Sequence, residues 1–180
     1  RRTIVVEMDE QPRPDTTVER LGTLRGIFGT EDITPGNAPG LNDGAAAVVV
    51  MTTSRAAELG LTPLATIVSE MGVTERPDGI SWVPATAFKA VLARSGVALS
   101  DISLIEINEA FAAMPLVSTK VLADNDEGRW KDLLERTNVN GGAVAVGHPV
   151  GASGLRILAT LVYQLRRQGG GLGGAAICGG

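Results

Sequence analysis

The sequence is poor in the side chains that usually mark a disulfide-rich, metal-binding or aromatic-cored protein. Its 180 residues include one cysteine and one histidine, and aromatic residues make up 3% of the chain. A single cysteine excludes an intrachain disulfide. With so few aromatics, the core has to be filled by Val, Leu, Ile and Ala, as in parallel sheets that are covered by helices.

Dense basic tracts and long apolar runs are also missing. The net charge is −4, and without a basic face the chain is not expected to bind nucleic acid. The apolar run 44–51 is far too short to span a bilayer. No charged-then-apolar leader opens the sequence, so we expect a cytoplasmic location. The chain begins with Arg1 rather than Met, which leaves room for a preceding segment.

Hydrophobic residues make up 44% of the chain, enough for one domain with a real core, or one domain plus part of another. From residue 44 onward, predicted strands alternate with predicted helices, which indicates an α/β fold with helices against a mostly parallel sheet. The pattern predicts strands at 1–8, 44–52, 64–71, 102–107, 139–146 and 174–178. It predicts helices at 17–28, 55–59, 84–95, 108–122, 126–135 and 151–167.

Polar or reactive groups follow three of these strands. They are Asn108 with Glu109, the 147–149 turn that contains His148, and Cys178 with its two following glycines. In open α/β sheets, functional groups gather at the carboxyl ends of strands. The three groups therefore form the candidate site.

Each group has a plain structural reading beside the functional one. Asn108 and Glu109 are typical of a helix start, as an N-cap and a first-turn acid. A lone cysteine such as Cys178 is usually a small buried hydrophobe, and a lone histidine such as His148 is more often structural than catalytic. On the functional reading, a neutral imidazole at a helix start donates to an oxyanion, and Cys178 is either a nucleophile or an acid/base.

The glycine-rich stretch 147–154 does not fit a dinucleotide cradle. It reads G-x-x-x-G-x-x-G instead of G-x-G-x-x-G, and no acidic residue follows the next strand. A dinucleotide cofactor is therefore rejected.

Taken together, three segments resemble the thiolase family. They are 138–154 (NVNGGAVAVGHPVGASG), 108–112 (NEAFA) and 176–180 (AICGG), and 37–47 (NAPGLNDGAAA) is also similar to a family segment. The resemblance implies a thiolase-like α/β fold, with a mixed sheet covered by helices. It also implies acyl transfer between coenzyme A thioesters, by thiolytic cleavage of a 3-ketoacyl-CoA or by Claisen condensation, with coenzyme A as substrate and neither a cofactor nor a metal.

The same resemblance assigns roles to four residues. Cys178 is the acid/base. His148 activates a nucleophilic cysteine and helps to bind a thioester oxygen. Asn108 positions a water in that oxyanion hole, and the backbone N–H of Gly180 contributes to a second one.

The resemblance also points to residues that bind the substrate. Arg13 would contact the nucleotide of coenzyme A, Phe28 and Leu41 would lie along the pantetheine arm, and Phe111 would line the same tunnel. Pro39 replaces a serine that is typical of the family, and Trp82 stands where small residues are common. Both changes bear on the choice of substrate.

The family's nucleophilic cysteine lies in its N-terminal half, and this chain has no second cysteine. We therefore expect a partner chain or a further segment to supply it, and an assembly that is a dimer or a tetramer. The expected division is 1–43 as a loop region that contacts coenzyme A, 44–60 as the last strand and helix of the N-terminal domain, and 61–180 as the C-terminal domain. The alternatives are a non-catalytic acyl-CoA or lipid-binding module and a purely structural subunit.

Overall fold

A short parallel sheet forms the centre of the fold in the computed structural model, which describes residues 3–9 and 12–179. Strand β1 (Ile102–Ile107) pairs with β2 (Leu172–Ala176), and the register places Ile107 opposite Ala176. All residues of β1 except Ser103 are buried, as expected for a strand that is covered on both faces. The predicted strand 102–107 is confirmed, and the last strand begins and ends two residues earlier than predicted.

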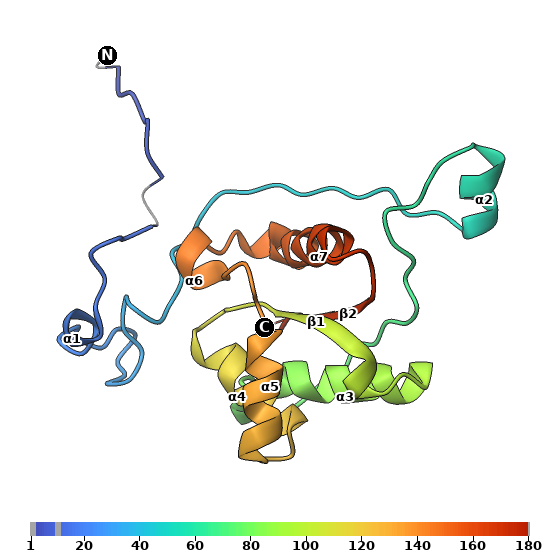
Figure 1. The fold of residues 1–180 in the computed structure, drawn as a ribbon. Coiled ribbons are helices and arrows are strands. Elements are labelled where there is room, and N and C mark those ends of the chain that lie inside the picture. The colour runs from blue at the N-terminus through green and yellow to red at the C-terminus, as the bar shows by residue number, and fades with distance from the viewer. Residues whose placement is uncertain (1–2, 10–11, 180) are drawn as a thin grey trace.

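Helices cover both faces of this sheet (Figure 1). The long helix α7 (Val150–Arg167) packs on one face of both strands, and α3 (Val83–Ser95) packs on the other. Helix α4 (Ala113–Leu122) lies against α3, and α5 (Glu127–Glu135) lies against α4. The helices predicted at 84–95, 126–135 and 151–167 are confirmed, so the α/β architecture is confirmed as well.

The core depends on glycines in β2 that let the helices approach the sheet. Phe88 of α3 is 2% exposed, and a Cβ on Gly174 would overlap its ring. On the opposite face, a Cβ on Gly173 would press against Leu161 of α7. The buried hydrophobic cluster joins residues of α3, β1, α4, α5 and β2.

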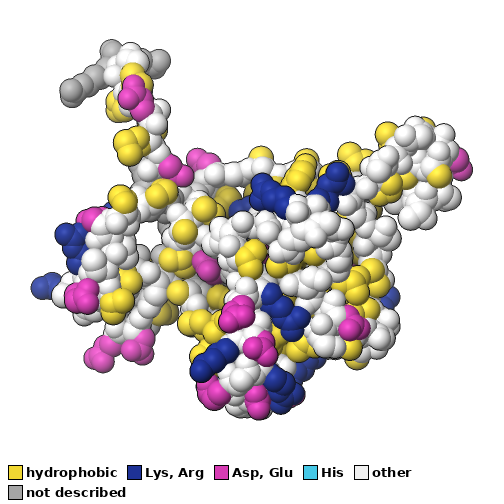
Figure 2. Space-filling model, viewed as in Figure 1, with side chains coloured by type: hydrophobic (Ala, Val, Ile, Leu, Met, Phe, Trp, Pro, Cys, Tyr) yellow, Lys and Arg dark blue, Asp and Glu magenta, His cyan; other side chains and the backbone are white. Residues whose placement is uncertain are grey.

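The region before residue 77 forms little regular structure, and three predicted strands are wrong there. The described part of 1–8 lacks strand pairing, and so do all of 44–52 and all of 64–71. Val49 is 86% exposed and Val50 is 69% exposed. A strand needs a neighbour to pair its backbone groups, and the described residues place none beside these segments. Figure 2 shows hydrophobic side chains on the surface of this extended region.

The short helices in this region also differ from the prediction. Helix α1 covers only Val18–Leu21, because Gly22 ends the helix that was predicted to reach residue 28. Helix α2 (Thr53–Glu58) starts two residues earlier than predicted, since Thr52 caps it. Two 3₁₀ turns, η1 (Pro77–Gly79) and η2 (Leu99–Asp101), flank α3 and lead into β1. No helix among the described residues has the length and apolar character needed to cross a bilayer.

Two further predictions are wrong beside the sheet. The predicted strand 139–146 is a loop followed by helix α6 (Ala143–Val146), because the Glu109 carboxylate accepts the Val144 N–H at 2.9 Å and fixes a helical turn. The helix predicted to start at Asn108 starts at Ala113 instead. The residues between β1 and α4 are thus free to form a site.

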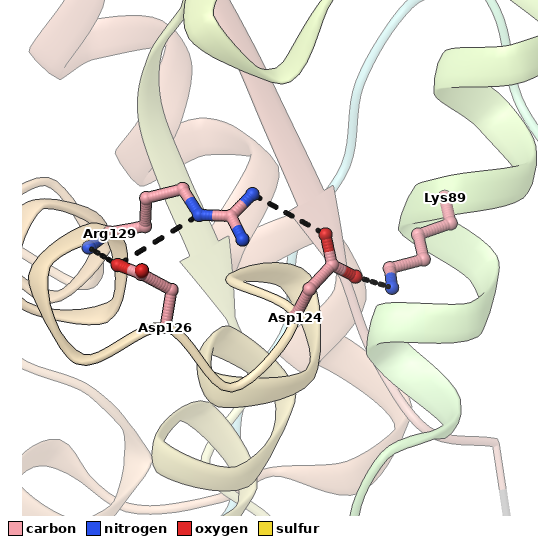
Figure 3. A network of polar contacts seen from close by, with 4 residues as sticks. All are labelled: Lys89, Asp124, Asp126 and Arg129. Atoms are coloured by element: carbon pink, nitrogen blue, oxygen red, sulfur yellow. Dashed lines mark hydrogen bonds and ion pairs between the residues drawn. The ribbon is translucent and has the colours of Figure 1, made fainter.

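A charged network on the surface joins α3 to the turn before α5 (Figure 3). Lys89 lies 2.9 Å from Asp124, which also accepts from Arg129 at 3.5 Å, and Asp126 caps α5. The nearby Lys89 ammonium lowers the pKa of Asp124. These side chains are exposed, so solvent and salt screen the ion pairs and their contribution to stability is small.

We expect Gly174→Ala to destabilise the fold by about 1–3 kcal/mol, because the added methyl group overlaps the buried ring of Phe88. Urea unfolding of the two proteins measures the difference. The control is Gly72→Ala, at an exposed position with open space around its Cα, which should change the free energy of unfolding by less than about 0.5 kcal/mol. Equal effects of the two substitutions would contradict the packing described for β2.

Candidate active site

Two of the predicted site residues follow the carboxyl ends of β1 and β2. Asn108 follows β1 directly, and its N–H donates to the carbonyl of Ala176, the last residue of β2, at 3.0 Å. Cys178 lies two residues beyond that strand. The pairing of the strands therefore sets Asn108 beside the chain that carries Cys178.

His148 enters the same site from the loop before α7. Its N–H donates to the Gly40 carbonyl at 3.1 Å and to Asn42 Oδ1 at 3.2 Å. Gly147 has φ +94°, and a Cβ there would overlap the Asn42 amide, so only glycine fits. The loop that contains Leu41 is thereby fixed against the histidine, and Leu41 forms an isolated parallel bridge with His148.

The imidazole of His148 contacts a side chain through each nitrogen. Nδ1 lies 2.7 Å from Ser153 Oγ, and Nε2 lies 3.4 Å from Asn108 Nδ2. Burial, with a further contribution from the charge of Arg156, lowers the pKa of His148. The imidazole is therefore neutral at physiological pH, and it can accept a proton.

The Asn108 side chain does not cap a helix. It is 1% exposed, its Oδ1 accepts from Arg156 Nη2 at 3.4 Å, and its Nδ2 faces His148. The prediction that Asn108 is a helix N-cap is therefore wrong, because α4 starts at Ala113 and the Asn108 amide contacts His148 and Arg156.

Two side chains fix the segment that leads to His148. Asn138 pairs with both backbone groups of Ile107: Nδ2 donates to the carbonyl at 2.8 Å, and Oδ1 accepts the N–H at 2.8 Å. Glu109 accepts from Val144 and, at 3.4 Å, from Asn138. Glu109 therefore orients neighbouring backbone, and it is not, as predicted, the first-turn acid of a helix, because α4 begins at Ala113. The sequence did not predict the structural role of Asn138. Its place at the start of the 138–154 segment, which resembles the thiolase family, was the one available signal.

Cys178 is half-buried, and its burial raises the pKa of the thiol. The protonated form is therefore favoured at neutral pH. A thiol of this kind acts as a proton donor, and it becomes a base once a reaction step removes its proton.

The predicted coenzyme A residues are not all gathered at this site. Phe111 is half-buried in the turn between β1 and α4, and Leu41 is 91% exposed beside His148. Phe28 is 77% exposed, and Arg13 is exposed in the N-terminal segment. Gly180, the predicted oxyanion-hole residue, lies outside the described residues.

Sequence reasoning also missed a buried acid next to the site. Glu106 of β1 is 3% exposed. Burial raises its pKa to about 7, while the charge of Arg156 opposes that shift and Glu109 adds to it. In the sequence, Glu106 is a polar residue in the predicted strand 102–107, and such a residue usually faces solvent. The sequence therefore did not mark it as a site residue.

We expect Asn138→Ala to reduce the free energy of unfolding by about 2–4 kcal/mol, since it leaves two buried backbone groups of Ile107 without partners. Urea denaturation measures the loss. Asn140→Ala is the control in the same loop, because Asn140 is exposed and its side chain hydrogen-bonds to the side chain of Gln164 instead of to buried backbone. A loss no larger than that of the control would show that Asn138 does not hold the loop.

Glu106 makes stability depend on pH. Because its folded pKa of about 7 lies above its ordinary value of 4.5, the folded state retains a proton that the unfolded chain releases. Its contribution to stability is full below pH 4.5, and it is lost as the pH rises to about 7, a change of roughly 3 kcal/mol. Unfolding free energies of the wild type and Glu106→Gln across this range measure it. The variant should lack this fall, and parallel pH profiles would contradict the assignment.

Known families match the chain in two blocks. The family model described as the thiolase C-terminal domain matches residues 61–180, and that of the thiolase N-terminal domain matches residues 1–54. An acetyl-CoA acetyltransferase from Thiocystis violacea is 46% identical over 97% of the chain, and the cytosolic acetyl-CoA acetyltransferase of Mus musculus is 45% identical over 96%. The chain spans 43% of the first relative and 42% of the second.

Solved structures agree with this match. The human mitochondrial 3-ketoacyl-CoA thiolase in complex with CoA superposes with a TM-score of 0.83 at 40% identity, over 97% of this chain and 43% of that one. The acetyl-CoA acetyltransferase of Bacillus anthracis gives the same TM-score at 41% identity, over 99% of this chain and 44% of that one. The chain therefore belongs to the thiolase family.

Proposed function

We propose that the protein supplies the acid/base and oxyanion-binding part of an acyl-CoA acyltransferase. The reaction is thiolytic cleavage of a 3-ketoacyl-CoA or Claisen condensation of two acyl-CoA molecules. The observation that carries this proposal is the convergence of Asn108 and His148, 3.4 Å apart, at the strand end that leads to Cys178. A module that only bound acyl-CoA would have no need of these three groups together.

The proposed roles follow from the protonation states. Neutral His148 takes the proton of a nucleophilic thiol, whose sulfur attacks the 3-keto carbon. The bond between C2 and C3 breaks, and the Cys178 thiol gives its proton to C2, which releases an acyl-CoA. The Cys178 thiolate then removes the proton of coenzyme A, whose sulfur takes the acyl group. The nucleophilic sulfur leaves as a thiolate and regains its proton from His148, which restores the starting state. Condensation runs through the same steps in reverse.

Charge on the thioester oxygen has to be stabilised in these steps. We propose that His148, once protonated at Nε2, and a water positioned by Asn108 form one oxyanion hole. The N–H of Gly180 would contribute to another. Each well-placed donor of this kind lowers the barrier by roughly 3 kcal/mol.

The nucleophile has to come from elsewhere, because Cys178 is the only cysteine of the chain. We propose that a preceding segment or a partner chain supplies it. In support, Val48, Val49 and Val50 are 54–86% exposed, although such side chains are normally buried. A sheet of that proposed segment or partner chain that paired with residues 44–52 would cover them. We propose that the complete assembly is a dimer or a tetramer.

For the substrate, we propose that Arg13 contacts the nucleotide of coenzyme A, that Phe28 and Leu41 follow the pantetheine arm, and that Phe111 lines the tunnel. The exposed apolar surfaces of Phe28 and Leu41 suit a thin flexible ligand. The proposed division is 1–43 for this loop region, 44–60 for the end of the N-terminal domain, and 61–180 for the C-terminal domain. For location we propose the cytoplasm, as named for the Mus musculus relative.

We expect Cys178→Ala to reduce partner-dependent cleavage of acetoacetyl-CoA by about 10²–10⁴-fold, because the proton donor is lost. Its affinity for coenzyme A, measured by calorimetry on the same assembly, should stay unchanged. Leu172→Ala, at the opposite end of β2, is the control and should retain activity. If Cys178→Ala turned over substrate like the control, the acid/base role would be wrong, and a non-catalytic acyl-CoA-binding module would be the better reading.

A further inference from the structure

The Asn108 amide lies between the Arg156 guanidinium, which can only donate hydrogen bonds, and the His148 imidazole, which can donate or accept them. Arg156 of α7 donates from Nη2 to Oδ1 at 3.4 Å, and the amide nitrogen faces His148 Nε2 at 3.4 Å. A guanidinium has five N–H donors and no acceptor. If the amide were flipped, its NH₂ group would face the guanidinium, and neither could accept. Arg156 therefore fixes which end of the Asn108 amide points at the histidine.

The orientation of the amide has a consequence for the imidazole. With an N–H of Asn108 directed at Nε2, that nitrogen has to present its lone pair. A neutral imidazole carries one proton, so the proton has to sit on Nδ1. In the other tautomer, two N–H groups would face each other and neither would have an acceptor.

Contacts on the opposite side of the ring agree. The Ser153 hydroxyl donates its only hydrogen to the Pro149 carbonyl at 3.1 Å. Its oxygen is then free to accept from Nδ1–H of His148, 2.7 Å away. Ser153 is fully buried, so water does not compete for this contact. The hydrogen-bond directions deduced from Arg156 and from Ser153 thus give the same tautomer.

Arg156 has an acidic neighbour on the sheet. Glu106 of β1 attracts its charge, and a separation of two residues along an extended chain directs Glu106 and Asn108 toward the same side. Helix α7 packs on β1 at this face. Arg156 Nε and Glu106 Oε2 are buried without a hydrogen-bond partner among the described residues, an arrangement that costs stability. Stability alone therefore does not account for an arginine at this position.

We propose that Arg156 is a positioning residue: it locks the Asn108 amide and, through it, holds His148 as the Nδ1–H tautomer with the Nε2 lone pair facing the site. The catalytic consequence rests on the acyl-transfer function proposed above. There, Nε2 has to accept a thiol proton, so the sulfur–hydrogen bond breaks and an Nε2–H bond forms, and the sulfur keeps the electron pair as a thiolate beside a positively charged imidazolium. The opposite tautomer has no lone pair at Nε2 and cannot take that proton.

The tautomer can be measured directly, because His148 is the only histidine in the chain. With ¹⁵N-labelled histidine, NMR of the full 180-residue chain at about pH 8 distinguishes a protonated ring nitrogen from an unprotonated one. We expect Nδ1 to carry the proton in the wild type. A proton on Nε2 there would overturn the proposal, and this outcome needs no variant.

Two substitutions of Arg156 distinguish its role as a hydrogen-bond donor from the effect of its bulk. Arg156→Gln keeps much of the side chain but introduces an amide that can also accept, so the Asn108 amide can flip and we expect the Nε2–H form to appear. Arg156→Lys still only donates, and the Nδ1–H form should persist. Arg166→Gln, at an exposed position of the same helix, should leave the spectrum unchanged. A pure Nδ1–H form in folded Arg156→Gln, or its loss in folded Arg156→Lys, would contradict the proposal.

This measurement requires neither a partner nor a substrate. If the tautomer is as proposed but partner-dependent turnover is never found, the acyl-transfer function fails while the role of Arg156 stands. If the tautomer is wrong and turnover is present, only the role of Arg156 fails. Should Arg156→Gln not fold, the wild-type spectrum and that of Arg156→Lys still decide the question.

Discussion

The parallel pairing of β1 with β2 is the constraint on which the rest of the site depends. Because Ile107 lies opposite Ala176, the residues that follow the two strands leave the sheet together, and Asn108 bonds to the chain that leads to Cys178. The pairing in turn requires glycines in β2, since Phe88 packs where a side chain on Gly174 would lie. A packing requirement in the core thereby fixes the position of the reactive groups.

Further polar contacts attach the loop that contains His148 to this sheet. The Asn138 amide pairs with the backbone of Ile107 in the way that a further strand would, and Glu109 holds the first turn of α6. Arg156 crosses from α7 to Asn108. These polar groups are buried and directional, so they place His148 more narrowly than apolar packing could. Burial also raises the pKa of Glu106 and of Cys178, and it lowers the pKa of His148.

The sequence predicted the parts of this structure that local patterns encode. The strand 102–107 and the helices ending at Ser95, Glu135 and Arg167 have clear apolar periodicity or caps, and the three motif residues follow strand ends or tight turns. The prediction failed where distant residues decide. The valine-rich run 44–52 has strand composition, but no other described segment lies beside it to pair with. Residues 139–146 form a loop and a helical turn because Glu109 binds Val144 from another part of the chain. The contacts of Arg156 and Asn138 join residues 48 and 31 positions apart, which no periodicity reveals.

The central claim is that this chain holds the acid/base half of an acyl-transfer centre whose nucleophile lies outside it. The most direct measurement is native mass spectrometry of the purified assembly after brief incubation with acetyl-CoA, followed by location of the acetylated residue. The account predicts a cysteine-containing segment or second polypeptide that carries the acetyl group, with Cys178 unmodified. An assembly of this chain alone, or an acetyl group on Cys178, would contradict it.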